Sequence, residues 1–234
     1  MNEANPRRNE ATAQTGAAAF RALLHAQRVW DVDHLPPFDP EAAPGSPTEL
    51  FHSWFADACA AGQPEPHTMQ LATADADGLP DVRTLMLHGA ADGVWEFASH
   101  SGSRKGRQLA ARPQAALHFY WPRLGRQIRV RGTVTTAPPE RAQADLHARS
   151  TGALAAALVG RQSEPLGSAA ELASASQSAW DRADRHPDTD VPTWTLYELT
   201  ANELEFFQGD ARRRHVRLRY RREGEGWSTG LLWP

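Results

Sequence analysis

The sequence predicts a mainly β fold with flanking helices, in which short antiparallel strands close, or partly close, into a barrel. Residues 127–134 alternate, with Ile128 and Val130 on one face and arginines on the other, as in a strand buried on one side. Asp-Gly pairs at 77–78 and 92–93 mark tight turns between apolar runs. Strand-like segments recur with few helices between them, a spacing that does not suit a doubly wound parallel sheet.

The N-terminal part, residues 1–34, is expected to form a mostly disordered or loosely helical arm. Its first 16 residues are small and polar, which favours disorder, and a short helix is expected over 17–29. Prolines make residues 35–47 irregular, because they remove backbone donors and fix φ. Ser46-Pro47-Thr48-Glu49 is a helix start, with proline at the first position and an acid in the first turn. This helix is expected to end near Gly62.

Residues 35–234 are expected to form one barrel domain. Strands are expected at 67–74, 82–88, 94–98, 115–121, 127–134, 194–200, 203–208, 215–221 and 227–232. Helices are expected at 103–111, before Pro113, and with breaks over 138–184.

Composition argues against several classes of protein. A chain of 234 residues with 41% hydrophobic content can bury one substantial core. A net charge of −3 and a pI near 6.4 argue against nucleic acid as the main partner. Cys59 is the only cysteine, so neither an intramolecular disulfide nor a Cys-based zinc site is expected. No apolar run approaches the ~20 residues of a membrane span, and the N-terminus lacks a signal-peptide core. We therefore expect a soluble cytoplasmic protein.

The single lysine, Lys105, lies in Ser101-Gly102-Ser103-Arg104-Lys105-Gly106, between a strand-like run and a helix. A helix start offers unpaired N–H groups and partial positive charge. Hydroxyls, a guanidinium and an ammonium at the same point form a receptor for a phosphate-like dianion. Taken alone, the hexapeptide favours an exposed capping turn with two solvated cations, so other residues must decide.

Other polar groups lie inside strongly patterned segments. Arg213, His215 and Arg217 alternate, so their side chains are expected on one face of one strand. Further candidates are Arg83 at a strand start, Gln127 before an alternating strand, and Gln162 and Ser163 within an apolar helix. Each also has a structural explanation, such as a solvated arginine or a helix break.

The sequence lacks the motifs of several common functional sites. His118, His147 and His215 lie far apart, with no Glu or Cys at ligand spacing, so no metal is expected. The chain has no Gly-x-Ser-x-Gly and no Gly-x-Gly-x-x-Gly after a strand, which argues against a serine hydrolase and a Rossmann domain.

Six motifs follow one another along the chain. They are Arg83-Thr84-Leu85-Met86-Leu87-His88, Gly102-Ser103-Arg104-Lys105, Phe119-Tyr120-Trp121 with Arg126-Gln127-Ile128-Arg129-Val130-Arg131-Gly132, Gln162-Ser163, Leu204-Glu205-Phe206-Phe207-Gln208-Gly209, and Arg213-Arg214-His215-Val216-Arg217-Leu218-Arg219-Tyr220. In this order they resemble the pyridoxine/pyridoxamine 5'-phosphate oxidase family, from about Pro36 to Pro234. The resemblance implies a split antiparallel β-barrel with flanking helices. It also implies a homodimer, with a C-terminal dimerisation region, that holds two FMN molecules between the subunits.

The resemblance also assigns roles by position. FMN contacts would be Arg83, Thr84, Leu85, Met86, Leu87, His88, Ser99, Arg104, Lys105, Gln127, Gln162, Ser163, Phe207 and Arg217. Substrate contacts would be His88, Arg149, Arg213 and His215, with Arg213 and His215 as the catalytic pair against the substrate ring. Phe207 stands where the family usually has Trp. Gln162 and Ser163 would reach the cofactor from another segment, for which the partner subunit is one source.

The substrate side departs from the family pattern. His88 replaces a phosphate-binding Lys, Asp145 a Tyr, Ala153 a Ser and Val216 an acid. An aspartate facing a substrate phosphate is repulsive, so either its side chain points away or the substrate differs.

The resemblance implies an FMN-dependent oxidase. It would move a hydride from an amine- or hydroxyl-bearing carbon to flavin N5, and O₂ would reoxidise the flavin to give H₂O₂. The default substrate is pyridoxamine or pyridoxine 5'-phosphate, giving pyridoxal 5'-phosphate. The alternatives are an oxidase acting on another substrate, such as a phenazine precursor, and a non-catalytic flavin-binding protein. A deazaflavin or haem reductase is disfavoured by Gln162-Ser163 and Arg213-x-His215. No nucleic-acid or membrane partner is expected.

Overall fold

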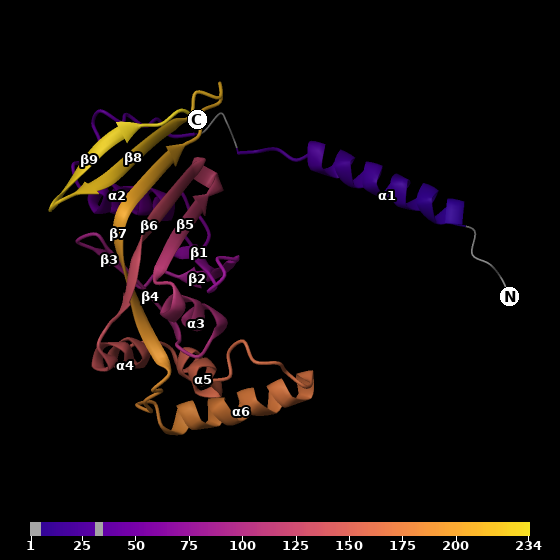
Figure 1. Ribbon diagram of the computed structural model, residues 1–234, viewed down its shortest axis with the longest axis vertical. Helices are drawn as coiled ribbons and strands as arrows, with labels where there is room; N and C mark the ends of the chain where they lie inside the picture. The colour runs from indigo at the N-terminus through magenta and orange to yellow at the C-terminus, as the bar shows by residue number, and fades with distance from the viewer. Residues whose placement is uncertain (1–5, 31–34) are drawn as a thin grey trace.

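A nine-stranded antiparallel sheet forms the centre of the molecule, in a computed structural model that describes residues 6–30 and 35–234 (Figure 1). The strands are β1 (Thr68–Ala74), β2 (Pro80–Met86), β3 (Gly89–Ala91), β4 (Val94–His100), β5 (Gln114–Trp121), β6 (Arg126–Thr136), β7 (Trp194–Gln208), β8 (Val216–Glu223) and β9 (Gly226–Leu231). The helices are α1 (Pro6–His25), α2 (Pro47–Ala60), α3 (Arg104–Ala111), α4 (Pro139–His147), α5 (Thr151–Val159) and α6 (Ala169–Arg185), with a short 3-10 turn at Pro122–Leu124. The expected antiparallel split barrel with flanking helices is confirmed.

The sheet divides at β7. One edge of β7 pairs with β6, whereas the other pairs first with β4 and then with β8. The register with β6 shifts between Arg131 and Gly132. A Cβ on Gly132 would lie 2.0 Å from the carbonyl oxygen of Thr200, so the backbones cross closely there. The expectation of two strands over 194–200 and 203–208 is therefore wrong, because this bulge lets one strand continue.

The two Asp-Gly turns are where the sequence predicts them. Gly78 has φ +88° in the β1–β2 hairpin, and Asp92 and Gly93 have φ +51° and +77° between β3 and β4. Positive φ at both Asp92 and Gly93 matches the twist of a two-residue hairpin, whereas β1 and β2 are joined by the longer loop 75–79. The sequence analysis missed β3, which has only three residues.

Helix α2 covers the aromatic core of the barrel. The hydroxyl of Ser46 accepts a hydrogen bond from the Glu49 amide and begins the helix. Phe51 and Trp54 are buried, and the Phe51 ring lies edge-on to that of Trp95, with centroids 4.4 Å apart. These contacts fix the barrel strands on which the site is built.

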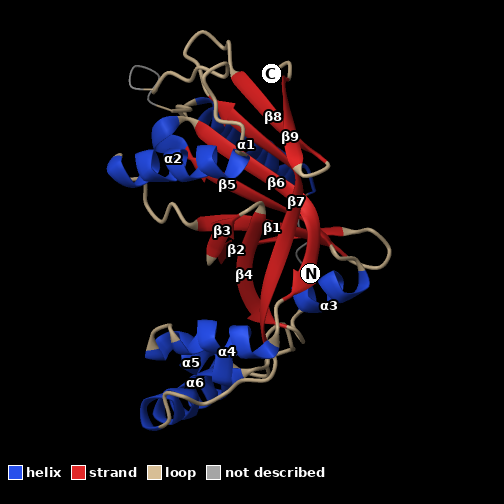
Figure 2. Cartoon of the chain, turned by 90° about the vertical axis from the view of Figure 1, so that its left-hand side faces the viewer, coloured by secondary structure: helices blue, strands red, loops and turns tan. Residues whose placement is uncertain are grey.

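The helices α4, α5 and α6 form a separate layer at the far end of β7 from β8 and β9 (Figures 1 and 2). They share a small apolar cluster that includes Leu146, Leu154 and Ala183. The helical zone expected over 138–184 is thus confirmed as three helices.

The N-terminal arm is more helical than expected. Helix α1 begins at Pro6, not at 17, so the expectation of disorder is wrong for residues 6–16; residues 1–5 and 31–34 lie outside the described residues. The alanine-rich sequence favours a helix. Figure 1 shows α1 projecting away from the barrel, and Phe20 is 60% exposed. Within the described ranges, no helix has the length and apolarity needed to cross a membrane.

Candidate functional site

Lys105 lies at the start of α3, where the chain leaves β4. The hydroxyl of Ser103 accepts a hydrogen bond from the Gly106 amide and caps the helix. The Lys105 ammonium is buried and donates to the hydroxyl of Ser99 at 3.0 Å and to the amide oxygen of Gln162 at 2.9 Å. The single lysine is therefore not a solvated cation on a capping turn.

Arg83 is held rigidly beside Lys105. Its guanidinium donates to the hydroxyl of Thr73 at 2.6 Å and to the amide oxygen of Gln108 at 3.1 Å. Asp81, two residues earlier on β2, forms an ion pair with it at 2.7 Å. Fixed donors of this kind suit a ligand that must be bound in one orientation.

These residues surround a cavity of about 370 Å³, which we call the cradle. The charged and polar side chains that line it are Asp81, Arg83, Thr84, Arg104, Lys105, Gln162 and Ser163. Three cations against one carboxylate leave two net positive charges. Burial, helped by the nearby charge of Arg83, lowers the pKa of Lys105 to about 8, although Asp81 opposes the shift. A bound dianion would compensate this charge.

Gln162 and Ser163 reach the cradle within one chain. Besides the contact of Gln162 with Lys105, the hydroxyl of Ser163 accepts a hydrogen bond from the Arg104 amide at 3.1 Å. Ser163 has φ +75°, in the loop after α5. The structure thus joins the segments that carry Arg83, Ser99, Lys105 and Gln162-Ser163, as the sequence predicts.

A second cavity, of about 510 Å³, adjoins the cradle and shares Leu85 and Gln162 with it. Apolar side chains from α5 and α6 form much of its wall. Its polar lining includes His88, Arg149 and Trp194. This mixture of an apolar slot and a few polar groups is typical of small-molecule sites, and we call it the substrate cavity because it contains His88 and Arg149, which the resemblance assigns to the substrate.

Asp145 connects the polar groups of the substrate cavity. Its carboxylate accepts hydrogen bonds from His88 Nδ1 at 2.8 Å and from the Trp194 indole at 3.3 Å. An Arg149 NH₂ group lies 2.6 Å from His88 Nε2. Arginine can only donate, so this nitrogen accepts, which places the imidazole proton on Nδ1.

The carboxylate stays charged in this network. Burial alone would raise the pKa of Asp145, but the hydrogen bond from His88 and the charge of Arg149 outweigh it and hold that pKa below its usual range. The side chain therefore points toward the other polar residues of the cavity. The negative charge of Asp145 offsets the positive charge of Arg149.

Phe207, Arg213, His215 and Arg217, which we call the ring group, lie around the β7–β8 connection. His215 Nδ1 accepts a hydrogen bond from the Asp210 amide at 3.0 Å, so a neutral His215 carries its proton on Nε2. Its ring centroid lies 5.1 Å from that of Phe207. Arg213 precedes β8 in a turn and has φ +63°.

The expectation that Arg213, His215 and Arg217 share one strand face is wrong, because Arg213 and His215 both precede β8 and only Arg217 lies on it. The Arg213 amide donates to the Asp210 carbonyl, and the Asp210 carboxylate binds the amides of residues 212 and 214, which bends the chain before β8 begins at Val216. The side chain of Arg217 binds Glu205 and the Trp233 carbonyl, each at 2.7 Å.

Gln127 belongs to a hydrogen-bonded row on the outer face of the sheet. Its side chain lies 3.3 Å from His118, which in turn lies 3.0 Å from Gln70. On the other side, Gln127 pairs in register with Phe207, and Phe207 with Arg217. Three residues expected to contact FMN are thus neighbours across β6, β7 and β8.

Within one chain, the cradle and the ring group lie far apart along β7. Ser99, beside Lys105, pairs with Thr195 near the beginning of β7, and Phe207 lies twelve residues farther along that strand. At ~3.3 Å per residue this is about 40 Å. Figure 1 shows β8 near the top of the molecule and α3 below its middle, next to the layer of α4, α5 and α6.

Sequence reasoning missed two residues that contact predicted site residues: Asp81, which pairs with Arg83, and Trp30, which packs against Phe207 and His215. Asp81 had a local signal, because its position two residues before Arg83 places both on the same side of a strand. Trp30 had none, since its partners Phe207 and His215 are distant in sequence.

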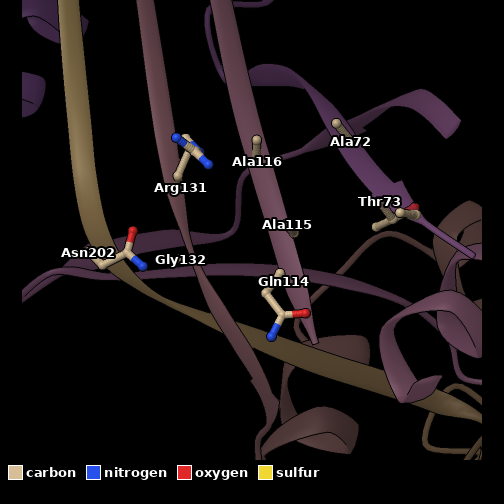
Figure 3. A pocket seen from close by; sticks show the side chains of 9 residues that line it. Ala72, Thr73, Gln114, Ala115, Ala116, Arg131, Gly132 and Asn202 are labelled. Atoms are coloured by element: carbon tan, nitrogen blue, oxygen red, sulfur yellow. The ribbon is translucent and has the colours of Figure 1, made fainter. Parts of the chain in front are cut away.

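Another hollow, of about 290 Å³, lies over β1, β5, β6 and β7 (Figure 3). Small side chains such as Ala72 and Ala116 line it, and Arg131 is its only charged residue. It contains no residue that the sequence analysis assigned to a site. Over residues 6–30 and 35–234, no group of three or more His, Cys, Asp or Glu side chains is arranged to hold a metal ion.

Two family models cover most of the chain. The model described as "Pyridoxamine 5'-phosphate oxidase" matches residues 55–182. The model described as "Pyridoxine 5'-phosphate oxidase C-terminal dimerisation region" matches residues 194–234, which include β7, β8 and β9.

Relatives and solved structures agree with these matches. The pyridoxine/pyridoxamine 5'-phosphate oxidase of Rubrobacter xylanophilus is 39% identical over 83% of this chain and 89% of its own length. That of Pseudomonas fluorescens is 40% identical over 82% of this chain and 90% of its own. PhzG from Burkholderia lata, solved in complex with tetrahydrophenazine-1-carboxylic acid, has a TM-score of 0.78 and 30% identity over 88% of this chain and 100% of its own. A pyridoxamine 5'-phosphate oxidase-related, FMN-binding protein from Nostoc punctiforme, 20% identical with a TM-score of 0.64 over 82% of this chain and all of its own, shares the fold.

The cradle fits the cofactor of this family. Its two net positive charges match a phosphate dianion, and the buried Lys105 ammonium and the Arg83 guanidinium supply fixed donors. The chain therefore belongs to the pyridoxamine 5'-phosphate oxidase family and is an FMN-dependent oxidoreductase with a split-barrel fold.

Proposed function

We propose that the protein is an oxidase that removes a hydride from an amine- or hydroxyl-bearing carbon of a ring substrate. FMN, when bound, would supply a hydride acceptor at N5, and O₂ would take up the two electrons to give H₂O₂. The single observation that carries this proposal is the cradle, with Lys105 buried beside Arg83, directly adjoining the substrate cavity.

Different residues of this chain would bind the cofactor and the substrate. Arg83, Arg104 and Lys105 would bind the phosphate of the cofactor, and Ser99, Gln162 and Ser163 would orient its neighbouring groups. In the substrate cavity His88 and Arg149 present polar groups at the end of an apolar slot. Arg213 and His215 orient the substrate ring, and the Asp210 amide keeps the proton of a neutral His215 on Nε2, where it can be donated. Hydride transfer depends on this orientation more than on a strong base.

The complete site is formed by two copies of the chain, with FMN between them. About 40 Å of β7 separates the cradle from the ring group. This length along the strand exceeds the length of one FMN molecule. The match of residues 194–234 to a dimerisation region supports a partner whose ring group faces this chain's cradle.

Two substrate classes have support. The curated relatives at 38–40% identity are named pyridoxine/pyridoxamine 5'-phosphate oxidases, which favours pyridoxamine or pyridoxine 5'-phosphate. Asp145 favours a substrate without a phosphate, because its carboxylate is bound to His88 and lies 3.6 Å from Arg149. PhzG, the structural neighbour with bound tetrahydrophenazine-1-carboxylic acid, supports a phenazine precursor as that substrate.

Anaerobic mixing of the FMN-loaded protein with each substrate tests the proposal. Flavin bleaching is followed by absorbance, and peroxide is measured after air is admitted. Bleaching by pyridoxamine 5'-phosphate supports the first substrate class, and bleaching only by a dihydrophenazine carboxylic acid supports the second. A protein that binds FMN but is bleached by neither would be a non-catalytic flavin-binding protein, which contradicts the proposal.

A further inference from the structure

Trp30, the last described residue of the N-terminal arm before the barrel segment, packs into the ring group. Its indole lies edge-on to the imidazole of His215, with centroids 5.7 Å apart and planes at 86°. It also lies against Phe207, at 6.0 Å between centroids. The indole N–H donates to the hydroxyl of Tyr120 at 3.1 Å. One side chain thus bridges strands β5 and β7 and the turn before β8.

The barrel leaves room for this ring. A Cβ on Gly209 would lie 2.7 Å from the Trp30 indole, so any larger side chain at that position would displace it. A Cβ on Gly125 would lie 3.6 Å from the same indole and 2.7 Å from Leu35. Trp30 itself has φ +60°, a conformation that costs free energy in a bulky residue and needs compensating contacts.

His215 is consequently held from two directions. The Asp210 amide fixes its Nδ1, and Trp30 and Phe207 restrict rotation of its ring. If Trp30 were absent, the imidazole would keep one hydrogen bond but lose one of the two aromatic contacts that set its plane. The direction in which Nε2 points would then be less well defined.

We infer that Trp30 is a positioning residue of the oxidase, which fixes the orientation of His215 and through it the position of the substrate ring. The inference rests on the proposed function for its consequence in turnover. The orientation of His215 itself is a property of the resting protein. Because misplacement of a reacting group by ~1 Å can cost up to ~10²-fold in rate, a change confined to Trp30 should appear in turnover before it appears in cofactor binding.

The test compares Trp30→Ala, Trp30→Phe and, as a control in the same arm, Phe20→Ala, whose side chain is 60% exposed on α1. Trp30→Ala should lower the limiting rate of flavin bleaching by about tenfold and change FMN affinity by less than about twofold. Trp30→Phe keeps an aromatic ring and loses only the hydrogen bond to Tyr120, so it should recover the rate to within about threefold. Phe20→Ala should behave like the unaltered protein.

A second readout does not depend on turnover. Long-range ¹H–¹⁵N spectra of the histidine rings should show one tautomer for His215, with the proton on Nε2, and an averaged signal in Trp30→Ala. If the spectrum changes but no substrate bleaches the flavin in any variant, the proposed function fails and the inference about His215 stands. An unchanged His215 signal in Trp30→Ala would overturn the inference, as would loss of FMN in both Trp30 variants.

Discussion

Asp145 should weaken the binding of phosphorylated substrates, and Asp145→Asn removes its charge with little change in shape. The substitution retains one oxygen, which can accept from His88 Nδ1, and places an NH₂ group where the second carboxylate oxygen accepted from the Trp194 indole. It removes the negative charge that offsets Arg149. A phosphate in the substrate cavity would then meet a net positive charge in place of a balanced pair.

The magnitude follows from the geometry. The Asp145 carboxylate lies 3.6 Å from the Arg149 guanidinium, so an anion bound by Arg149 would lie roughly 6 Å from that carboxylate on its far side. Two unit charges at ~6 Å interact by about 3 kcal/mol at an effective dielectric constant of ~20. The side chain of Asp145 is 18% exposed, and screening by solvent and salt roughly halves this value. A gain of about 1.4 kcal/mol corresponds to about a tenfold lower KM.

The assay measures peroxide release with pyridoxamine 5'-phosphate and with pyridoxamine, which lacks the phosphate. In Asp145→Asn, KM should fall about tenfold for the first compound and stay unchanged for the second. Asp190→Asn is the matched control, because Asp190 is 70% exposed and pairs with His147. Equal changes of KM for the two compounds, or no change for either, would refute the electrostatic reasoning.

Three further predictions concern the cofactor, the ring group and the fold. Lys105→Met should weaken FMN binding by about 100-fold and leave riboflavin binding unchanged. In the unaltered protein, FMN affinity should fall as pH rises through about 8, because the charged form of Lys105 is then lost. Titration of flavin fluorescence measures both effects, and an FMN affinity that does not depend on pH would contradict the role of Lys105. Arg213→Ala should lower turnover by about tenfold or more with flavin retained, whereas loss of flavin with unchanged turnover per remaining flavin would show that Arg213 binds the cofactor instead. Gly132→Ala should destabilise the protein by about 2 kcal/mol or more in urea unfolding, because its Cβ would lie 2.0 Å from the Thr200 carbonyl oxygen. The control Gly230→Ala should be nearly neutral, because no atom lies within 4 Å of the added Cβ.

The sequence predicts much of the fold because its signals are local. Alternation over 127–134 and the Asp-Gly pairs mark strands and turns through interactions between near neighbours, and these features appear in the structure. The same holds for the start of α3, where Ser103 caps the helix that carries Lys105. The antiparallel barrel then follows from the number and spacing of the strands.

What the sequence did not predict depends on distant partners. The continuity of β7 requires the pairing with β6, which absorbs a bulge on β7 at Asn202, opposite Arg131 and Gly132. Arg213 leaves the strand because the Asp210 carboxylate binds nearby amides, a preference that alternation does not report. The contact between Asp145 and His88 joins residues 57 positions apart, so no local pattern could show which way that carboxylate points.

The length of β7 has a thermodynamic consequence for the proposed two-chain site. If each flavin is bound by the cradle of one polypeptide and the ring group of the other, flavin binding and subunit association are linked equilibria. Each then strengthens the other by the same factor. Diluting the holoprotein should then release the yellow chromophore, and adding excess chromophore should draw separated chains back together. The fraction of flavin that stays bound would thus depend on the concentration of the polypeptide.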